Sequence, residues 1–235
     1  MTDEIEAVKE TAKAAQEIAR TAGKAIDASE KFGGFISRFI SGSFEQGIGI
    51  FEDKLKYMRW ERQQRLMRRA EDFMASQGLK EPTKPISLKL AIPLLQAASL
   101  EEDNHLQDLW AKLLVNAVNI SKGLDLKRVY IDILERLTPI EVRILERIYS
   151  LPFEETQYSG ILTVNLPEEV SIADDESREE GQPADEVKLA LSSLSMLNCL
   201  YLPRSVGGGE IFTWVNPTLL GKNFVEACTL QKTPR

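Results

Sequence analysis

The stretch from residue 99 to residue 117, SLEEDNHLQDLWAKLLVNA, constrains the fold more than any other part of the chain. Ser99 and Glu102 have the spacing of a capping box, which marks the start of a helix. Apolar residues then recur at steps of three and four, which places them on one helical face: Leu100, Leu106, Leu109, Trp110, Leu113, Leu114 and Ala117. We therefore expect an amphipathic helix over residues 99–117 that buries this face in a core.

With the preceding AIPLLQAA, this stretch resembles the hallmark segment of the abortive-infection alpha family of bacterial proteins. In that family Ser-Leu-Glu-x-Asp leads into Leu-x-x-x-Trp-Ala-x-Leu-Leu-x-Asn-Ala. The matching positions are Ser99, Leu100, Glu101, Asp103, Leu106, Trp110, Ala111, Leu113, Leu114, Asn116 and Ala117. The resemblance covers residues 30–150 well and the rest loosely. It implies phage defence by abortive infection, in which the infected cell is arrested or dies, but it implies no biochemical activity.

Within this signature we assign four residues a structural role: Glu101, Asp103, Trp110 and Asn116. Trp110 is the expected core anchor. The carboxylates of the same helix are Glu101, Glu102, Asp103 and Asp108. They suit the positive end of a helix better than a metal site, because Ca²⁺ and Mg²⁺ usually draw their ligands from loops or several elements.

Residues 3–31 read as a helix with small side chains at coiled-coil spacing: Ile5, Val8, Ala12, Ala15, Ala19, Ala22 and Ile26. Such a seam favours packing within the chain, and a homo-oligomer formed through the helix at 5–26 stays open as the alternative.

The next segment, residues 32–51, has a Phe and Ile face opposite a face of Gly, Ser and isolated charges. Two interpretations are open. The segment is a packing helix whose glycines let another backbone approach, since each interior glycine costs a helix about 1 kcal/mol. Alternatively, it inserts conditionally into a membrane interface through Phe35, Phe39, Phe44 and Ile48.

Residues 52–77 continue as a basic helix in which Arg62, Arg65 and Arg69 line one side. This stripe is either a solvated face or a docking strip for anionic lipid head groups or an acidic protein partner. The turn-forming residues Gly78, Pro82 and Pro85 follow. We therefore divide the chain into an N-terminal helical region at 1–78, a signature region at 79–135 and a C-terminal module at 136–235.

The C-terminal module has the pattern helix, strand, helix, hairpin, helix. Thr138, Pro139 and Glu141 start the first helix, Asp185 is expected to cap the second, and Gly207–Gly209 form the hairpin turn. This order resembles a winged-helix domain, so the expected fold is mainly α with a winged-helix-like α+β module. The helix at 185–200 has Lys188 as its only cation and follows the acidic loop 174–186. DNA binding is therefore disfavoured, and packing or protein docking is favoured.

The sequence contains no arrangement of residues typical of catalysis. His105 is the only histidine, which excludes paired-histidine metal sites, and helical spacing would let it pair with Glu101 or Glu102. Cys199 and Cys228 lie in apolar contexts that are typical of core thiols. We expect a non-enzyme without metal or cofactor. The absence of a signal peptide and of a long apolar run predicts a cytoplasmic protein, with peripheral membrane association as an option.

Overall fold

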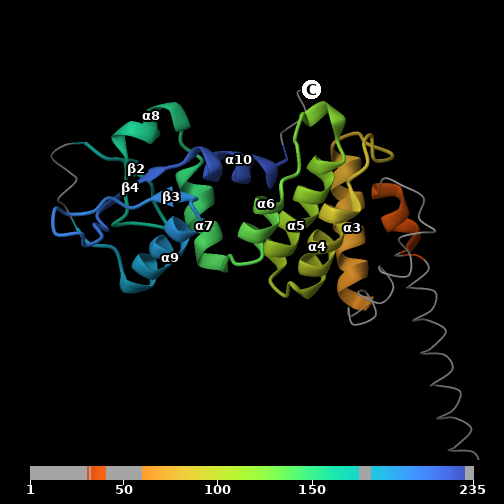
Figure 1. Ribbon diagram of the computed structural model, residues 1–235, viewed down its shortest axis with the longest axis horizontal. Helices are drawn as coiled ribbons and strands as arrows, with labels where there is room; N and C mark the ends of the chain where they lie inside the picture. The colour runs from red at the N-terminus through yellow and green to blue at the C-terminus, as the bar shows by residue number, and fades with distance from the viewer. Residues whose placement is uncertain (1–30, 32, 41–59, 175–180, 231–235) are drawn as a thin grey trace, which may run out of the picture.

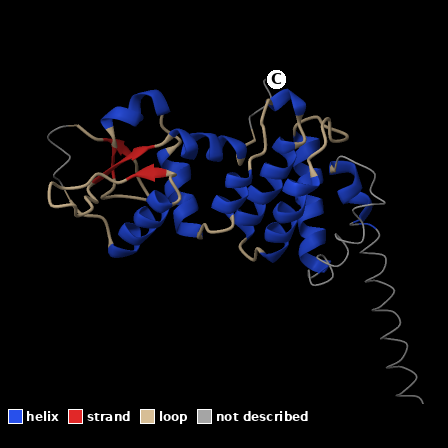
Figure 2. Cartoon of the chain, in the orientation of Figure 1, coloured by secondary structure: helices blue, strands red, loops and turns tan. Residues whose placement is uncertain are grey.

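The computed structural model describes residues 31, 33–40, 60–174 and 181–230. This part of the chain is mainly helical, with one small antiparallel sheet, as the sequence predicts. Figure 1 shows an elongated arrangement in which α3 lies near one end and the sheet lies at the other. Figure 2 shows that the strands are confined to the C-terminal half.

The first half is a bundle of helices around the signature segment. Its elements are α3 (Trp60–Ser76), α4 (Leu88–Leu100), α5 (Asn104–Ala117), the 3-10 helix η1 (Ile120–Lys122) and α6 (Arg128–Leu134). The central helix α5 contacts α3 and α4 within the bundle and α7 and α10 beyond it. Trp110 on α5 is only 1% exposed, so its indole is part of the core. Because α3 and α5 share that core, the turns after Gly78 connect helices of one packed unit.

The second half combines four helices with four short strands. They run in the order α7 (Pro139–Ile148), α8 (Phe153–Ser159), β1 (Ile161–Leu162), β2 (Ser171–Ile172), α9 (Asp185–Met196), β3 (Leu200–Tyr201), β4 (Trp214–Pro217) and α10 (Leu219–Ala227). The strand order is β2-β1-β4-β3, and all neighbours are antiparallel. Helix α10 leads from the sheet back to α5, so the two halves share one hydrophobic core (Figure 1).

Local sequence signals in this half are mostly confirmed. The capping box of α7 forms, since the Thr138 N–H donates to the Glu141 carboxylate over 2.6 Å. The hairpin also forms: Leu200 pairs with Pro217, Arg204 bridges to Glu210, and Gly208 adopts φ +84° in the turn. Only glycine adopts such a φ at low cost, which explains the glycine at position 208.

Three details differ from the prediction. Asp185 is the first residue of α9, and the N-cap position belongs to Ala184. Helix α9 ends at Met196, because Asn198 takes a positive φ of 60° that breaks the helix before residue 200. The strand expected in GILTVNL reduces to β1, and the sequence missed α8 and β2, whose short lengths give too few residues for a periodic signal.

Candidate functional site

The turn between α4 and α5 is organised by carboxylates of the family signature. Asp103 is the N-cap of α5, and its Oδ1 accepts hydrogen bonds from the backbone N–H groups of His105 (2.8 Å) and Leu106 (2.9 Å). The Glu101 carboxylate accepts from the N–H groups of Glu102 and Asp103. These bonds satisfy backbone donors that a helix start would otherwise leave unpaired.

The predicted capping box of Ser99 and Glu102 is therefore wrong. Ser99 lies in the last turn of α4, where its hydroxyl donates to the Gln96 carbonyl. The expected helix over 99–117 is the end of one helix, a turn and the start of another. Leu100, which we expected on the buried face, is exposed for the same reason.

Two arginines of α3 hold this turn in place. Arg62 donates to the Leu100 carbonyl over 2.8 Å and pairs with the Glu102 carboxylate. The carbonyl belongs to the C-terminus of α4, where a cation is favoured by the helix dipole. Seven residues further along α3, Arg69 pairs with Asp108 and donates to the Asn104 side chain over 2.7 Å.

These contacts show what the arginines of the predicted basic stripe do in the folded protein. The side chains of Arg62 and Arg69 are only 14% and 21% exposed, so neither is solvated or free to dock a partner in this structure. Arg65 points elsewhere and lies 3.8 Å from Glu61, one turn earlier on the same helix. We call the contacts of Arg62 and Arg69 with the α4–α5 turn and the start of α5 the arginine clamp. The sequence did not predict it, because the partners of the two arginines lie 35 to 40 residues away.

The other polar groups of the signature differ: the buried atoms Gln107 Oε1, Trp110 Nε1 and Asn116 Oδ1 have no hydrogen-bond partner, whereas His105 has one. His105 Nε2 lies 3.0 Å from Glu146 Oε2 on α7, so its expected pairing with Glu101 or Glu102 is wrong. The described residues contain no cluster of three or more His, Cys, Asp or Glu side chains that could hold a metal ion.

Residues 33–40 are the described part of segment 32–51, which we call the aromatic segment, and they pack on the core. Phe35, Ile36 and Phe39 are buried, and the rings of the two phenylalanines lie 4.5 Å apart between centroids. The Ile86 N–H donates to the Phe39 carbonyl over 2.7 Å. Arg38 completes the attachment by pairing with Glu71 at 2.9 Å.

Close backbone packing at the glycines of this segment is not observed where they are described. A Cβ added at Gly33 or Gly34 would meet nothing within 4 Å, so that expectation is wrong at these two positions. Phe44, Ile48 and the seam at 5–26 lie outside the described residues.

Asn116, the last polar residue of the signature, joins the two halves of the molecule. Its buried side-chain amide donates to the carbonyls of Ala227 (2.8 Å) and Thr229 (2.9 Å), more than 110 residues away. The Ala227 carbonyl belongs to the last turn of α10, which has no helical partner for it, and Thr229 follows just after the helix. The signature asparagine is therefore a tie between α5 and α10.

A tyrosine that the sequence analysis did not single out makes a second junction. Tyr149 donates its hydroxyl to the Cys199 carbonyl (2.5 Å) and accepts from the Thr218 N–H (2.9 Å). Burial raises the pKa of Tyr149 to about 12. Gly221 makes room for this contact, since a Cβ there would overlap both the hydroxyl and the carbonyl.

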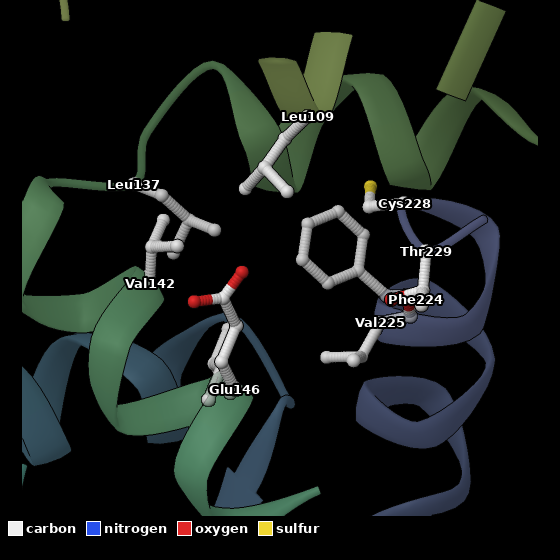
Figure 3. Close-up of a pocket in the computed structure, with 9 residues that line it drawn as sticks. Leu109, Leu137, Val142, Glu146, Phe224, Val225, Cys228 and Thr229 are labelled. Atoms are coloured by element: carbon white, nitrogen blue, oxygen red, sulfur yellow. The ribbon is translucent and has the colours of Figure 1, made fainter. Parts of the chain in front are cut away.

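A small apolar pocket lies between α5, α7 and α10 (Figure 3). Figure 3 shows the Glu146 carboxylate pointing toward the space between Leu109 and Phe224, with Cys228 on the far side of the Phe224 ring from Glu146. The pocket encloses about 250 Å³ including its open mouth, which is below the usual range of small-molecule sites. Burial raises the pKa of the Cys228 thiol, which makes it a poor nucleophile. We therefore regard the pocket as a packing defect at the junction of the two halves.

Comparison with known proteins agrees with the signature. The family model described as abortive infection alpha matches residues 61–228, which begins within α3 and ends just after α10. No curated protein and no solved structure matches the chain. Within the described residues, every helix is too short or too polar to cross a membrane. The matched region includes the arginine clamp, the Asp103 cap and the Asn116 tie, and the chain belongs to the abortive infection alpha family.

Proposed function

We propose that this chain is a non-enzymatic effector of abortive infection in the cytoplasm, and that residues 32–74 bind an anionic membrane surface after they leave the core. The family supports the association with abortive infection. The observation that supports the mechanism is the state of the aromatic segment: its face of Phe35, Ile36 and Phe39 is fully apolar and is covered by the rest of the chain.

The attachment of this segment is strong enough to keep it closed and local enough to be reversed. Burial of three large apolar side chains is worth roughly 5–8 kcal/mol in total. Its polar attachments include the Phe39–Ile86 backbone bond and the ion pairs of Arg38 with Glu71 and Glu81, whose side chains are partly exposed. A closed state favoured by several kcal/mol keeps the released state rare until a trigger binds it preferentially.

Release would provide both components of membrane binding. The apolar face would insert at the interface, with Phe44 and Ile48 extending it along the sequence. If α3 follows, Arg62 and Arg69 leave their carboxylates and meet lipid phosphates, while Arg65 is already unclamped. An acidic protein partner could use the same arginines, and the vesicle experiment below separates the two.

A reversible covalent staple tests the proposal on the full chain. Ile40 and Ile86 are bridge partners, so cysteines at both positions are neighbours across the bridge and suit a disulfide. The native thiols Cys199 and Cys228 are buried and do not compete. We expect wild-type protein to float with vesicles containing phosphatidylglycerol and not with pure phosphatidylcholine. The Ile40→Cys/Ile86→Cys variant should float only after reduction, and each single variant should behave as wild type.

The outcomes are distinct. Equal flotation of the oxidised and reduced staple would show that release of the segment is not needed. Absence of flotation by every variant, including wild type heated close to its unfolding transition, would reject the membrane mechanism. Phe39→Glu provides a second check. The carboxylate should lower the thermal stability of the closed state, in which position 39 is buried, and it should weaken membrane binding of the released segment.

DNA binding by the C-terminal half is not proposed. Lys188, the only cation of α9, is paired with Asp185 at 3.0 Å. A duplex is bound chiefly through neutralised phosphates, which one paired lysine cannot provide. We expect no shift of random duplex DNA at low-micromolar protein and no effect of Lys188→Ala. A salt-dependent shift that is lost in this variant would reverse the assignment.

A further inference from the structure

Helix α9 presents an apolar stripe to solvent on the side opposite the core. Its buried residues are Val187, Ala190, Leu191 and Leu194. The residues on the other side follow steps of four, three and four, so they form one line: Asp185, Leu189, Ser192 and Met196. The side chains of Leu189 and Met196 are 74% and 89% exposed. The side of α9 that faces away from the core therefore exposes two large apolar side chains, Leu189 and Met196, on a line with polar residues.

The hairpin between β3 and β4 borders this stripe. The Ser192 hydroxyl donates to the Glu210 carboxylate over 3.2 Å, which fixes the hairpin beside the middle of α9. Together, Asp185, Glu186, Leu189, Ser192, Met196 and Glu210 make one continuous surface, which we call the α9 face.

Exposed apolar side chains concentrate in this half of the molecule. Among the described residues, only Leu100 and Ile120 are large, apolar and exposed outside it. Inside it the set is Tyr158, Val164, Ile172, Leu189, Met196, Tyr201, Val206 and Leu219. Single exposed apolar residues are common on protein surfaces, whereas Leu189 and Met196 lie on one line of one helix, where a single partner can cover both.

The charge of this half indicates what the α9 face can bind. The described residues 149–174 and 181–230 contain nine Asp and Glu against three Lys and Arg, an excess of six negative charges. Two of these three cations, Lys188 and Lys222, are ion-paired. On the α9 face itself, Glu186 and Glu210 are exposed. Such a surface repels nucleic acid and anionic lipid and attracts cationic groups.

We propose that the α9 face is a docking site for a cationic amphipathic helix of a partner protein. Leu189 and Met196 contact the apolar side of that helix, and methionine adapts well to varied partners. Glu186 and Glu210 pair with its lysine or arginine side chains at the rim. This surface is separate from residues 32–74, so its test does not depend on the membrane mechanism.

The proposal is tested with full-length protein and a fluorescent helical peptide of leucine and lysine at amphipathic spacing, by fluorescence polarisation. Leu189→Ser/Met196→Ser changes only exposed side chains and should weaken binding about tenfold or more, as the loss of central interface contacts does. Ile120→Ser removes an apolar residue that is 65% exposed from the other half and should leave binding unchanged. Glu186→Lys/Glu210→Lys should weaken binding and flatten its salt dependence.

Two results would overturn the proposal. Equal affinity of wild type for a scrambled peptide, together with no effect of Leu189→Ser/Met196→Ser, would show charge attraction without docking at α9. A wild-type dimer in sedimentation that the same double variant converts to monomer would show that a second copy occupies the α9 face. Circular dichroism of each variant confirms that lost binding does not reflect unfolding.

Discussion

Asn116 should be one of the most sensitive polar positions in the chain. Its amide donates to two carbonyls at the end of α10, and the Ala227 bond is buried while the Thr229 bond is partly exposed. An unpaired buried carbonyl costs about 1–3 kcal/mol, and one that water can reach costs less. Asn116 Oδ1 is buried without a partner, so its removal offsets part of the loss. We expect Asn116→Ala to lower the free energy of unfolding by about 2 kcal/mol.

Urea unfolding followed by circular dichroism measures this change. With a denaturant dependence of about 2 kcal/mol/M, the midpoint should fall by about 1 M. Because Asn116 ties α5 to α10, loss of the tie should also favour separate transitions of the two halves. Asn223→Ala is the matched control, since it removes one exposed amide bond to the Leu219 carbonyl and should cost under about 0.5 kcal/mol.

Asn116→Asp sharpens the test, because it keeps the shape and replaces the donor with an acceptor. Burial and two facing carbonyls raise the pKa of the new carboxyl in the folded state, so its charged form opposes folding. The destabilisation should therefore be largest above the raised folded-state pKa, should shrink as pH falls below that pKa, and should be lost near the unfolded-state pKa of about 4. A cost for Asn116→Ala no larger than that for Asn223→Ala would refute the reasoning.

Three further predictions concern the junctions and thiols. Gly221→Ala should destabilise the protein by about 2–3 kcal/mol in thermal melts, because the added methyl group would overlap the Tyr149 hydroxyl and the Cys199 carbonyl. Gly34→Ala places its methyl group in open space and should be neutral or stabilising. Arg69→Gln should lower the free energy of unfolding in urea by about 1 kcal/mol, since the Arg69–Asp108 ion pair is only partly buried. An unchanged urea midpoint would mean that this ion pair does not stabilise the fold. The pKa of Cys199 is raised to about 12 and that of Cys228 is also raised by burial, so neither thiol should react with iodoacetamide at pH 9 until urea unfolds the chain; labelling of folded protein at the rate of free cysteine, read by mass spectrometry, would contradict this.

Where the sequence predicted structure correctly, the signal was local. The capping box of Thr138 and Glu141 and the Gly207–Gly209 turn each depend on bonds within a few residues, so they form wherever the chain places them. The apolar periodicity of the signature likewise identified the buried face around Trp110. The family itself was recognisable from the same stretch.

The failures show where local signals become ambiguous. Ser99 and Glu102 have capping-box spacing, but Ser99 already belongs to α4, and Asp103 takes the cap because the chain turns between two helices. Spacing alone could not separate one helix from two, since apolar residues keep helical periodicity across a short turn. His105 had acidic neighbours at helical spacing and bonded across the fold to Glu146 instead.

The sequence by itself determined the family, the mainly helical class, the C-terminal hairpin and the residue types available to a site. Only the tertiary structure decided that Arg62 and Arg69 clamp the α4–α5 turn, that Asn116 ties α5 to α10, and that α9 exposes two large apolar side chains. The physical reason is range: caps and turns form between near neighbours. The partner of a long charged or amide side chain, by contrast, is set by which helices pack together, and that follows from burial of the whole core.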